Sequence, residues 1–290
     1  MLFPPEPQWM AICNLTPDSF SDGGCYEDTK ALLRHAHRAL AAGATWLELG
    51  GESTRPGAEP ISPAQERERV LPALEALAPV MAAYPEAHLA IDTRHASTAA
   101  EAIAHGAQLV NDVSGLRTEG EALLALVAKH PTVQLVLMHS LSTPKTMQHQ
   151  PLTPHTVVAA VQQGLLSLKQ QALLAGVNPA QLLMDVGLGF GKTLEANFTL
   201  LHHLPTLQQA VSLPVFLGLS RKRCLAWPLS QAVAESEDLL PPAQREAATA
   251  VLTQQVGLAL GPAFVIARVH DVAAQRGAWL AAHTLANRGG

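Results

Sequence analysis

Residues 89–113 read LAIDTRHASTAAEAIAHGAQLVNDV, and this stretch decides the fold class. Two short runs, Leu89–Asp92 and Leu109–Val113, are rich in Leu, Ile and Val and stand on either side of a longer segment. A short apolar run, a helix-length segment and a second apolar run form the pattern of a βα unit in a parallel sheet. The stretch therefore predicts parallel strands connected by helices.

The same alternation continues in both directions along the 290-residue chain. The segments between the runs have helical spacing; Val158, Val161, Leu165 and Leu168, for example, would share one helix face. Eight strands and eight helices predict an α/β fold, a closed (β/α)8 TIM barrel built as a single domain over residues 1–290, with the barrel at about 9–287. Periodicity alone leaves an open, doubly wound sheet as the alternative. The eight expected strands are Trp9–Leu15, Trp46–Gly51, Leu89–Asp92, Leu109–Val113, Val133–His139, Leu182–Val186, Val215–Leu219 and Phe264–His270.

Composition and charge exclude several classes of protein. The chain is 48% hydrophobic but only 4% aromatic, which suits closely packed helices around a sheet and argues against disorder. A net charge of −5 without a basic stripe makes nucleic acid an unlikely partner. The N-terminus lacks the features of a secretion signal, and no apolar run approaches the ~18 residues of a membrane span. We therefore expect a cytoplasmic protein with no membrane partner.

The cysteines indicate neither a disulfide framework nor a zinc site. Cys13, Cys25 and Cys224 are odd in number and lack CxxC spacing. All three are expected to be free thiols.

Polar residues recur where each predicted strand ends. In an α/β barrel these positions converge on the C-terminal face, where barrel enzymes build their chemistry. A single Asn or Asp at such a point is often only a helix cap or a loop hydrogen bond, but recurrence in every repeat indicates a site. The residues are Asn14; Glu52, Ser53, Thr54 and Arg55; Asp92 and Arg94; Asn111 and Asp112; His139; Asp185; Ser220, Arg221 and Lys222; Arg268 and His270.

The charges of these residues divide the expected site into two sides. Asp92 and Asp185 would be costly to bury without donors, and a flat, nitrogen-rich heterocycle offers such donors. Asn111 can supply a donor and an acceptor to the same ring edge. Cations can bind a phosphate or pyrophosphate by forked and point-charge contacts. The expected cations are Arg55, Arg221, Lys222, Arg268 and His270.

The glycine-rich run Gly187–Thr193, GLGFGKT, resembles a phosphate loop only at its end. Val186 stands where a Walker A motif needs glycine, and the glycine spacing does not match that of a dinucleotide fold. We expect a strand-to-helix loop whose glycines let the backbone approach a flat ligand while Phe190 covers it. Lys192 is expected to be a solvated loop charge.

Asn14–Gly24, NLTPDSFSDGG, is a long and specific string directly after the first predicted strand. It resembles the first signature of the dihydropteroate synthase family of pterin-binding enzymes, and Gly50–Gly57, GGESTRPG, resembles the second. The resemblance extends from about Trp9 to Asp271 and favours the closed barrel over the open sheet. Further matches follow in the family's order at Ile91–Thr93, Asn111–Gly115, Met138–His139, Ser220–Lys222 and Arg268–Asp271.

The resemblance implies a reaction and its substrates. The family condenses 6-hydroxymethyl-7,8-dihydropterin pyrophosphate with 4-aminobenzoate, giving 7,8-dihydropteroate and pyrophosphate in folate biosynthesis. It implies a transferase that is a sulfonamide target and a homodimer formed through helices late in the barrel. In this reaction the main barrier is loss of pyrophosphate from a CH2 carbon, so we expect a largely dissociative displacement.

The resemblance also implies roles for individual residues. Asp92, Asn111 and Asp185 would hold the pterin, Thr54 would contact it, and Lys222 would reach both the pterin and the aminobenzoate side. The expected anion and metal ligands are Arg268 and His270 for the pyrophosphate, Arg55 as a further substrate-binding cation, and Asn14 for Mg2+. The aminobenzoate pocket would be shaped by Phe190, Pro56 and Ser220, and the residues expected to be catalytic are Asp92, Lys222, Arg268 and His270.

The chain departs from the family's usual pattern at a few positions. Val186 and Leu188 replace the usual Pro and the first Phe of the glycine-rich loop, and Val186 lacks the fixed φ that Pro would give. Two alternatives share the fold: a pterin-binding methyltransferase, which needs no pyrophosphate site, and a catalytically idle pterin-binding paralogue. The Thr16–Phe20 loop together with Ser220–Lys222 argues against the methyltransferase. An activity assay is needed to exclude the idle paralogue.

Overall fold

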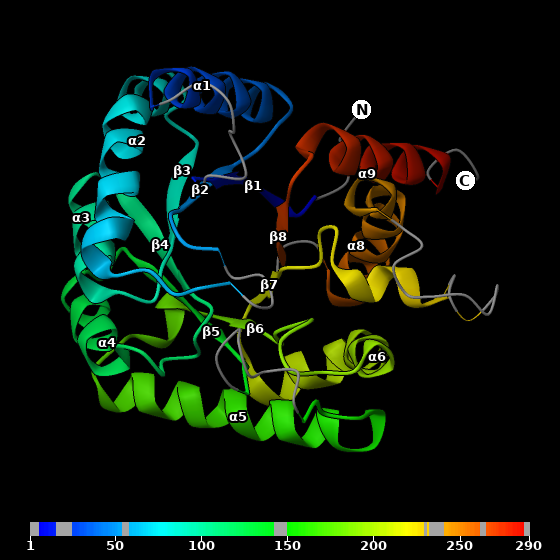
Figure 1. The fold of residues 1–290 in the computed structure, drawn as a ribbon. Helices are drawn as coiled ribbons and strands as arrows, with labels where there is room; N and C mark the ends of the chain where they lie inside the picture. The colour runs from blue at the N-terminus through cyan, green and yellow to red at the C-terminus, as the bar shows by residue number, and fades with distance from the viewer. Residues whose placement is uncertain are drawn as a thin grey trace.

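Eight parallel strands close into a barrel in the order β1 to β8, and β8 pairs back onto β1 (Figure 1). The structure is a computed structural model that describes residues 6–15, 25–53, 58–141, 150–228, 231, 241–261 and 265–286. The closed order confirms the TIM barrel and rules out the open sheet. The strands are β1 (Gln8–Asn14), β2 (Trp46–Gly50), β3 (His88–Asp92), β4 (Ala107–Asp112), β5 (Gln134–Met138), β6 (Leu182–Asp185), β7 (Val215–Leu217) and β8 (Val265–Val269).

Helices surround the strands as an outer layer (Figure 1). Several begin with side-chain caps: Ser62 and Gln65 form a capping box at the start of α2, and Thr193 accepts from the Ala196 N–H at the start of α6. Within the described residues, no helix combines the length and apolarity that crossing a membrane requires. The helices are α1 (Cys25–Ala41), α2 (Pro63–Ala83), α3 (Ala96–Ala104), α4 (Gly120–Lys129), α5 (Pro154–Leu174), α6 (Leu194–Val211), α8 (Glu246–Leu260) and α9 (Val272–Ala286), with short 3-10 turns η2 (Pro179–Gln181), η3 (Arg223–Ala226) and η4 (Pro242–Arg245).

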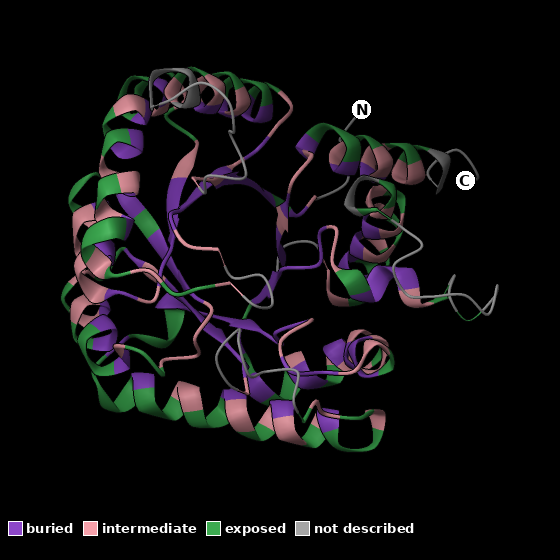
Figure 2. Cartoon of the chain, in the orientation of Figure 1, coloured by how far each residue is buried: buried purple, intermediate pink, exposed green. Residues whose placement is uncertain are grey.

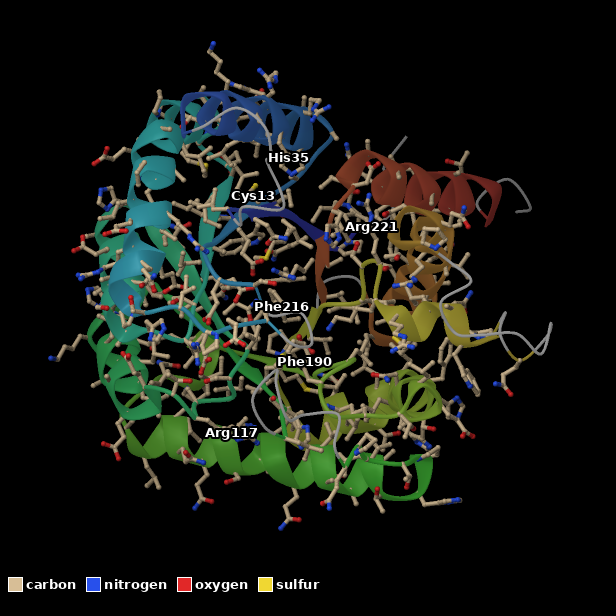
Figure 3. All side chains as sticks on the ribbon, in the orientation of Figure 1. Cys13, His35, Arg117, Phe190, Phe216 and Arg221 are labelled. Atoms are coloured by element: carbon tan, nitrogen blue, oxygen red, sulfur yellow. The ribbon has the colours of Figure 1, made fainter. Side chains whose placement is uncertain are left out.

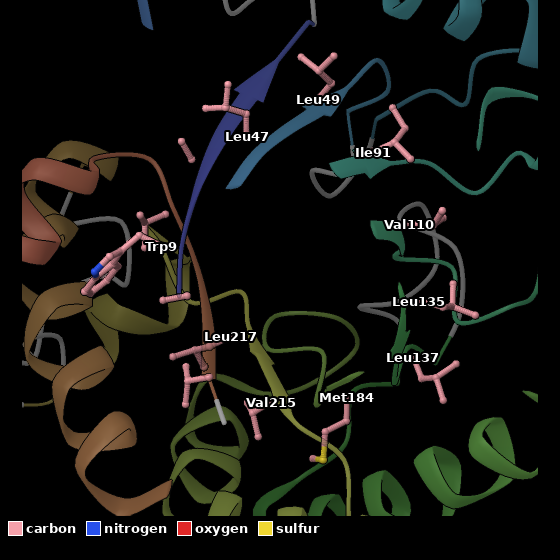
Figure 4. Close-up of a cluster of buried hydrophobic side chains, with 14 of the residues drawn as sticks. Trp9, Leu47, Leu49, Ile91, Val110, Leu135, Leu137, Met184, Val215 and Leu217 are labelled. Carbon is pink, nitrogen blue, oxygen red and sulfur yellow. The ribbon is translucent and has the colours of Figure 1, made fainter. Parts of the chain in front are cut away.

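The strands are buried on both faces (Figure 2), as expected for a parallel sheet covered by helices. Successive side chains alternate between the inside of the barrel and the helix layer. Outward-facing residues such as Leu47, Leu49 and Ile91 pack against the helices in the main core (Figure 4).

Inside the barrel, each strand contributes one apolar side chain to a closed cluster. We call this cluster the lower layer; its members are at most 5% exposed, and Phe216 is seen among the strands in Figure 3. Strand register places its members side by side, as in the pairs Ala90–Leu109 and Phe216–Ile266. The lower layer consists of Met10, Trp46, Ala90, Leu109, Val136, Leu183, Phe216 and Ile266.

Two residues further along each strand, nearer the carboxyl ends, the inward-facing positions form a second layer. We call it the upper layer, and it consists of Ile12, Glu48, Asp92, Asn111, Met138, Asp185, Gly218 and Arg268. Five of these eight residues are polar or charged. Because α/β barrels build their sites at this end of the strands, the upper layer is the floor of the candidate site.

Candidate active site

Arg268 joins two carboxylates within the upper layer. Its Nε donates to Glu48 Oε2 at 2.5 Å, and its Nη2 donates to Asp92 Oδ2 at 3.0 Å. Burial raises the pKa of Asp92 well above its ordinary value, Glu48 adds to this, and Arg268 opposes it. Burial would lower the pKa of Arg268, but the charges of Glu48 and Asp92 outweigh it and the pKa rises. Arg268 is therefore a permanent cation between two acids.

Glu48 was not expected at the site. It is 1% exposed and lies in the middle of β2, where the sequence indicated only an apolar run. The available signal was alternation: Trp46, Glu48 and Gly50 share one face of the strand while Leu47 and Leu49 share the other. A charged residue on the inward face of a barrel strand indicates a buried partner.

Asn111 is held by Glu48 through only one end of its amide. Asn111 Nδ2 donates to Glu48 Oε1 at 2.9 Å, whereas Asn111 Oδ1 is buried and has no hydrogen-bond partner among the described residues. From the sequence, we expected Asn111 to offer both a donor and an acceptor to a ring. The structure leaves Oδ1 as an acceptor for a ligand, while one of the two Nδ2 N–H groups is bound to Glu48.

Asp185 and Lys222 face each other across Gly218. A Cβ at position 218 would lie 3.3 Å from Asp185 Oδ2 and 3.8 Å from Lys222 Nζ, so glycine leaves room for both groups. Asp185 Oδ1 accepts from the Gly187 N–H at 2.7 Å. Burial raises the pKa of Asp185 and lowers that of Lys222, and in each case the opposite charge of the partner works against the shift.

Lys222 also contacts the glycine-rich loop. Its Nζ donates to the Leu188 carbonyl and lies 4.8 Å from the centre of the Phe190 ring, a cation–π distance. Figure 3 shows Phe190 on the side of the barrel opening nearest α5 and α6. Lys222 therefore joins the acidic floor of the site to an aromatic wall, as expected for a residue between two substrate positions.

The expectation that Lys192 is solvated was wrong. Lys192 is 2% exposed, and its Nζ donates to the carbonyls of Gly187 at 2.8 Å and Phe190 at 2.9 Å. Gly187, Gly189 and Gly191 have φ values of +67°, +81° and +66°, and this left-handed path lets the loop wrap around the ammonium. Burial lowers the pKa of Lys192 to about 7.

His139 lies beneath the same loop. A Cβ on Gly187 would lie only 1.9 Å from the His139 carbonyl oxygen, which explains why glycine is required at that position. The His139 ring lies beside Lys192, with Nδ1 3.3 Å from Nζ. Burial and then the charge of Lys192 lower the pKa of His139 to about 3. The ring is therefore neutral at neutral pH, and its role here is to pack under the loop.

Ser220 and His270 form a pair at the ends of β7 and β8. The His270 backbone N–H donates to Ser220 Oγ at 3.2 Å, and Ser220 Oγ lies 2.9 Å from His270 Nδ1. The serine hydroxyl can then donate to Nδ1, which places the proton of the neutral imidazole on Nε2. The pair stands on the side of the mouth where the sequence predicted an anion.

Asn14 lies beside Asp92 at the end of β1. A Cβ on Gly50 would lie 3.8 Å from Asn14 Oδ1 and 3.4 Å from the Asp92 Cβ, so both side chains lie over this glycine. The described residues contain no group of three or more His, Cys, Asp or Glu that could hold a metal ion. Mg2+ nevertheless needs only one or two protein oxygens when substrate phosphates and water complete its octahedron. Asn14 Oδ1 fits that requirement.

Other polar residues at strand ends serve the loops. Glu52 pairs with Arg94 at 2.8 Å and accepts from the Ile61 N–H, just before α2, at 3.1 Å. Asp112 accepts from the N–H groups of Ser114 and Leu116.

Arg221 was expected among the cations of the anion side. Its Nε instead lies 2.6 Å from Glu246 Oε2, and Figure 3 shows it beside α8. Three expected substrate-binding residues, Thr54, Arg55 and Pro56, lie outside the described residues.

Residues 10–270 match a protein family model described as pterin binding enzyme. A dihydropteroate synthase of Mycobacterium leprae (strain TN) is 40% identical over 279 residues, which cover 94% of this chain and 93% of that protein. One from Escherichia coli K12 is 37% identical over 268 residues, covering 92% and 87%.

Solved structures agree. A Yersinia pestis dihydropteroate synthase in a sulfonamide drug complex has a TM-score of 0.79 at 36% identity and covers 98% of this chain and 95% of its own. A Xanthomonas albilineans dihydropteroate synthase in complex with 7,8-dihydropteroate has a TM-score of 0.77 at 33% identity, with 97% and 94% covered. Fold and sequence therefore lead to the same family.

Proposed function

Because this chain belongs to the dihydropteroate synthase family of pterin binding enzymes, we propose that it carries out that family's reaction. It joins 6-hydroxymethyl-7,8-dihydropterin pyrophosphate to 4-aminobenzoate and releases pyrophosphate, as a transferase of folate biosynthesis. The observation that carries the proposal is the upper layer, where Asp92, Asn111 Oδ1 and Asp185 present acceptors beside the cations Lys222 and Arg268.

The acceptors suit the donor-rich edge of a pterin. Asp92, Asn111 and Asp185 come from neighbouring parts of the barrel wall and are all buried. Asn111 Oδ1 is buried without a partner among the described residues, which is costly, and an N–H or amino group of the ring would remove that cost. We assign these three residues, with Thr54, to the pterin.

Phe190, Pro56 and Ser220 are proposed to enclose 4-aminobenzoate. Lys222 supports this division, because it contacts the Phe190 ring on one side and faces Asp185 on the other. An arylamine held against this wall would point its nitrogen at the CH2 carbon of the pterin. Close positioning of the two reactants supplies a large share of the rate enhancement for a bimolecular step.

Arg268, His270 and Arg55 are proposed to hold the diphosphate, and Asn14 to hold Mg2+ with the diphosphate oxygens. Among the described residues, Arg268 Nη1 forms no hydrogen bond, so the guanidinium keeps a donor for an anion while Glu48 and Asp92 fix its plane. When bound, Mg2+ would neutralise charge on the leaving oxygens.

The reaction then proceeds as a displacement at carbon. The CH2–O bond breaks and its electron pair leaves with pyrophosphate. The arylamine nitrogen forms the new C–N bond and gives up one proton to solvent or to the departing pyrophosphate. Positive charge that develops on the pterin lies next to Asp92 and Asp185, which stabilise it electrostatically. Asp92, Lys222, Arg268 and His270 are therefore the proposed catalytic residues.

A homodimer in the cytoplasm completes the proposal. An apolar groove lies between α6 and α8, lined by Phe198, Leu201 and Pro205 on one side and Leu252 and Val256 on the other. Val251 and Leu258 on α8 are more than half exposed. Exposed apolar residues beside an apolar groove are typical of an interface, and we propose that a second copy of the chain covers them. Light scattering should give a dimer mass for the wild-type chain and a monomer mass for Leu258→Arg.

A coupled assay for pyrophosphate release tests the function. The chain is mixed with 6-hydroxymethyl-7,8-dihydropterin pyrophosphate, with and without 4-aminobenzoate and Mg2+. We expect release to require both the arylamine and the metal, and 7,8-dihydropteroate to form in equal amount. Release that ignores 4-aminobenzoate, or no release at all, would contradict the proposal.

A further inference from the structure

We propose that Glu48 is a positioning residue that sets the hydrogen-bonding polarity of the pterin site by holding the Asn111 amide so that its Oδ1 acceptor is turned to the ligand. This inference rests on the proposed function and deepens it. Glu48 is buried below the site, where it accepts hydrogen bonds from Asn111 and Arg268. It would therefore act through these neighbours without contacting the substrate.

Glu48 connects parts of the barrel that do not pair with each other. It stands on β2, whose neighbours in the sheet are β1 and β3. Its two oxygens bind Asn111 on β4 and Arg268 on β8, each one strand beyond those neighbours. One side chain thereby fixes two groups on opposite sides of β2 relative to each other.

The chemistry of the pair decides which way the Asn111 amide points. An ionised carboxylate only accepts hydrogen bonds, whereas an amide has a donor end and an acceptor end. Asn111 must therefore turn Nδ2 toward Glu48 and Oδ1 away from it. The result is the buried, unpartnered Asn111 Oδ1. Such an atom is costly unless a ligand donates to it.

Asn111 Oδ1 would then act with Asp92 and Asp185, which lie in the same layer and each keep one carboxylate oxygen beyond the bonds to Arg268 and Gly187, as the acceptors for one ligand edge. Such a set selects a heterocycle whose edge carries N–H and amino groups, and it rejects one that carries a carbonyl at the same place, because two acceptors would oppose each other. Glu48 is thus inferred to contribute to specificity, in addition to neutralising Arg268.

The substitution Glu48→Gln should reverse this polarity. Arg268 Nε can only donate, so the oxygen of the introduced amide would turn to Arg268. The amino group of that amide would then face Asn111 and require Oδ1 to turn inward, which leaves Asn111 Nδ2 facing the ligand. Glu and Gln side chains are nearly the same size, so a loss of packing at position 48 would not explain the expected change in ligand preference.

Isothermal titration with two probes tests the inference: 6-hydroxymethylpterin, and the corresponding lumazine, in which an oxo group replaces the 2-amino group. We expect the wild-type chain to prefer the pterin. Glu48→Gln should reduce this preference at least about tenfold, while Glu48→Asp, which still only accepts, should keep it within about threefold. Glu6→Gln is the matched control, because Glu6 also accepts from an arginine, Arg276, but lies just before β1, at the amino-terminal end of the strands. It should leave the preference unchanged.

The outcomes separate this inference from the proposed function. A wild-type chain that binds neither probe would count against the function. A wild-type chain that prefers the pterin, with a folded Glu48→Gln variant of equal preference, would overturn only the role of Glu48. If Glu48→Gln fails to fold, Asn111→Ala decides, because removing the acceptor must lower the preference by a similar factor. An unchanged preference in that variant would also overturn the inference.

Discussion

The lower and upper layers of the barrel are built by the same eight strands, two residues apart, and they differ in composition and in energetic effect. The lower layer has one apolar side chain per strand and almost no exposed surface. The upper layer has Glu48, Asp92, Asn111, Asp185 and Arg268 in the corresponding positions. Side chains two residues apart on a strand both point into the barrel. The lower layer therefore serves the core and the upper layer the candidate site because their side chains differ in chemistry.

The two layers have opposite effects on stability. Burying apolar surface in the lower layer stabilises the fold. The upper layer buries acids whose pKa values are raised and an amide oxygen without a partner, both of which cost free energy until a ligand arrives. Variants in the lower layer should therefore change unfolding, and variants in the upper layer should change turnover.

The largest expected effect is in the lower layer. Phe216→Ala removes a buried aromatic ring, so the free energy of unfolding should fall by about 3–5 kcal/mol in urea titration. The folded fraction of this variant should keep kcat/KM within about threefold. A loss below about 1 kcal/mol would contradict the assignment of this layer to the core.

The second effect is in the upper layer. Asp92→Asn removes a negative charge next to the developing pterin cation, so kcat should fall by about 10²–10³-fold in the pyrophosphate-release assay. Its free energy of unfolding should be unchanged or higher, because a buried acid with a raised pKa costs stability when ionised. Full turnover in Asp92→Asn would contradict the assignment of the upper layer to the reaction.

A third effect concerns pH at the mouth of the site. The pKa of His139 falls from 6.5 unfolded to about 3 folded, so below pH 6.5 the unfolded chain binds a proton that the folded chain does not. Stability due to this group is present above pH 6.5 and is lost as the pH falls toward 3. Compared with His139→Asn, wild type should lose about 2 kcal/mol more between about pH 7 and pH 5. Urea titrations of both proteins at the two pH values measure this difference, and parallel pH curves would contradict it.

The smallest effect concerns the loop that carries Phe190. Lys192→Met removes the ammonium that holds the Gly187 and Phe190 carbonyls, so kcat/KM for 4-aminobenzoate should fall by roughly tenfold through less exact positioning. Lys129→Met, at a lysine in the last turn of α4 far along the chain from the loop, is the control and should be neutral. Equal activity in both variants would mean that Lys192 does not organise the loop.

Much of the barrel could be predicted from sequence because its signal is repeated. Each strand run is confirmed within about two residues at either end. Of the polar strand-end residues, Asp92, Asn111, Asp185 and Arg268 lie in the upper layer, whereas Arg221 pairs with Glu246 beside α8. Asp92, Asn111, Asp185 and Lys222 could be placed because a residue at the end of a parallel strand has only one face of the barrel to occupy.

The partners of these residues could not be predicted in the same way. Glu48 stands between two leucines, so the sequence indicated only an apolar strand there. Lys192 was expected to be solvated because its partners are backbone carbonyls of a left-handed loop, which residue types do not indicate. Glu52 and Arg94 were among the polar strand-end residues that indicated a site, and the structure shows that they bind each other. Which side chains pair depends on distances across the barrel, and the spacing of residues along the chain does not give these distances.

A crystal structure of the chain with 6-hydroxymethylpterin and pyrophosphate tests most directly whether the upper layer is the substrate site. We expect N–H groups of the ring within hydrogen-bond distance of Asp92, Asn111 Oδ1 and Asp185, with pyrophosphate against Arg268 and His270. A ring bound outside the barrel mouth, or one that meets Asn111 through Nδ2, would contradict this assignment.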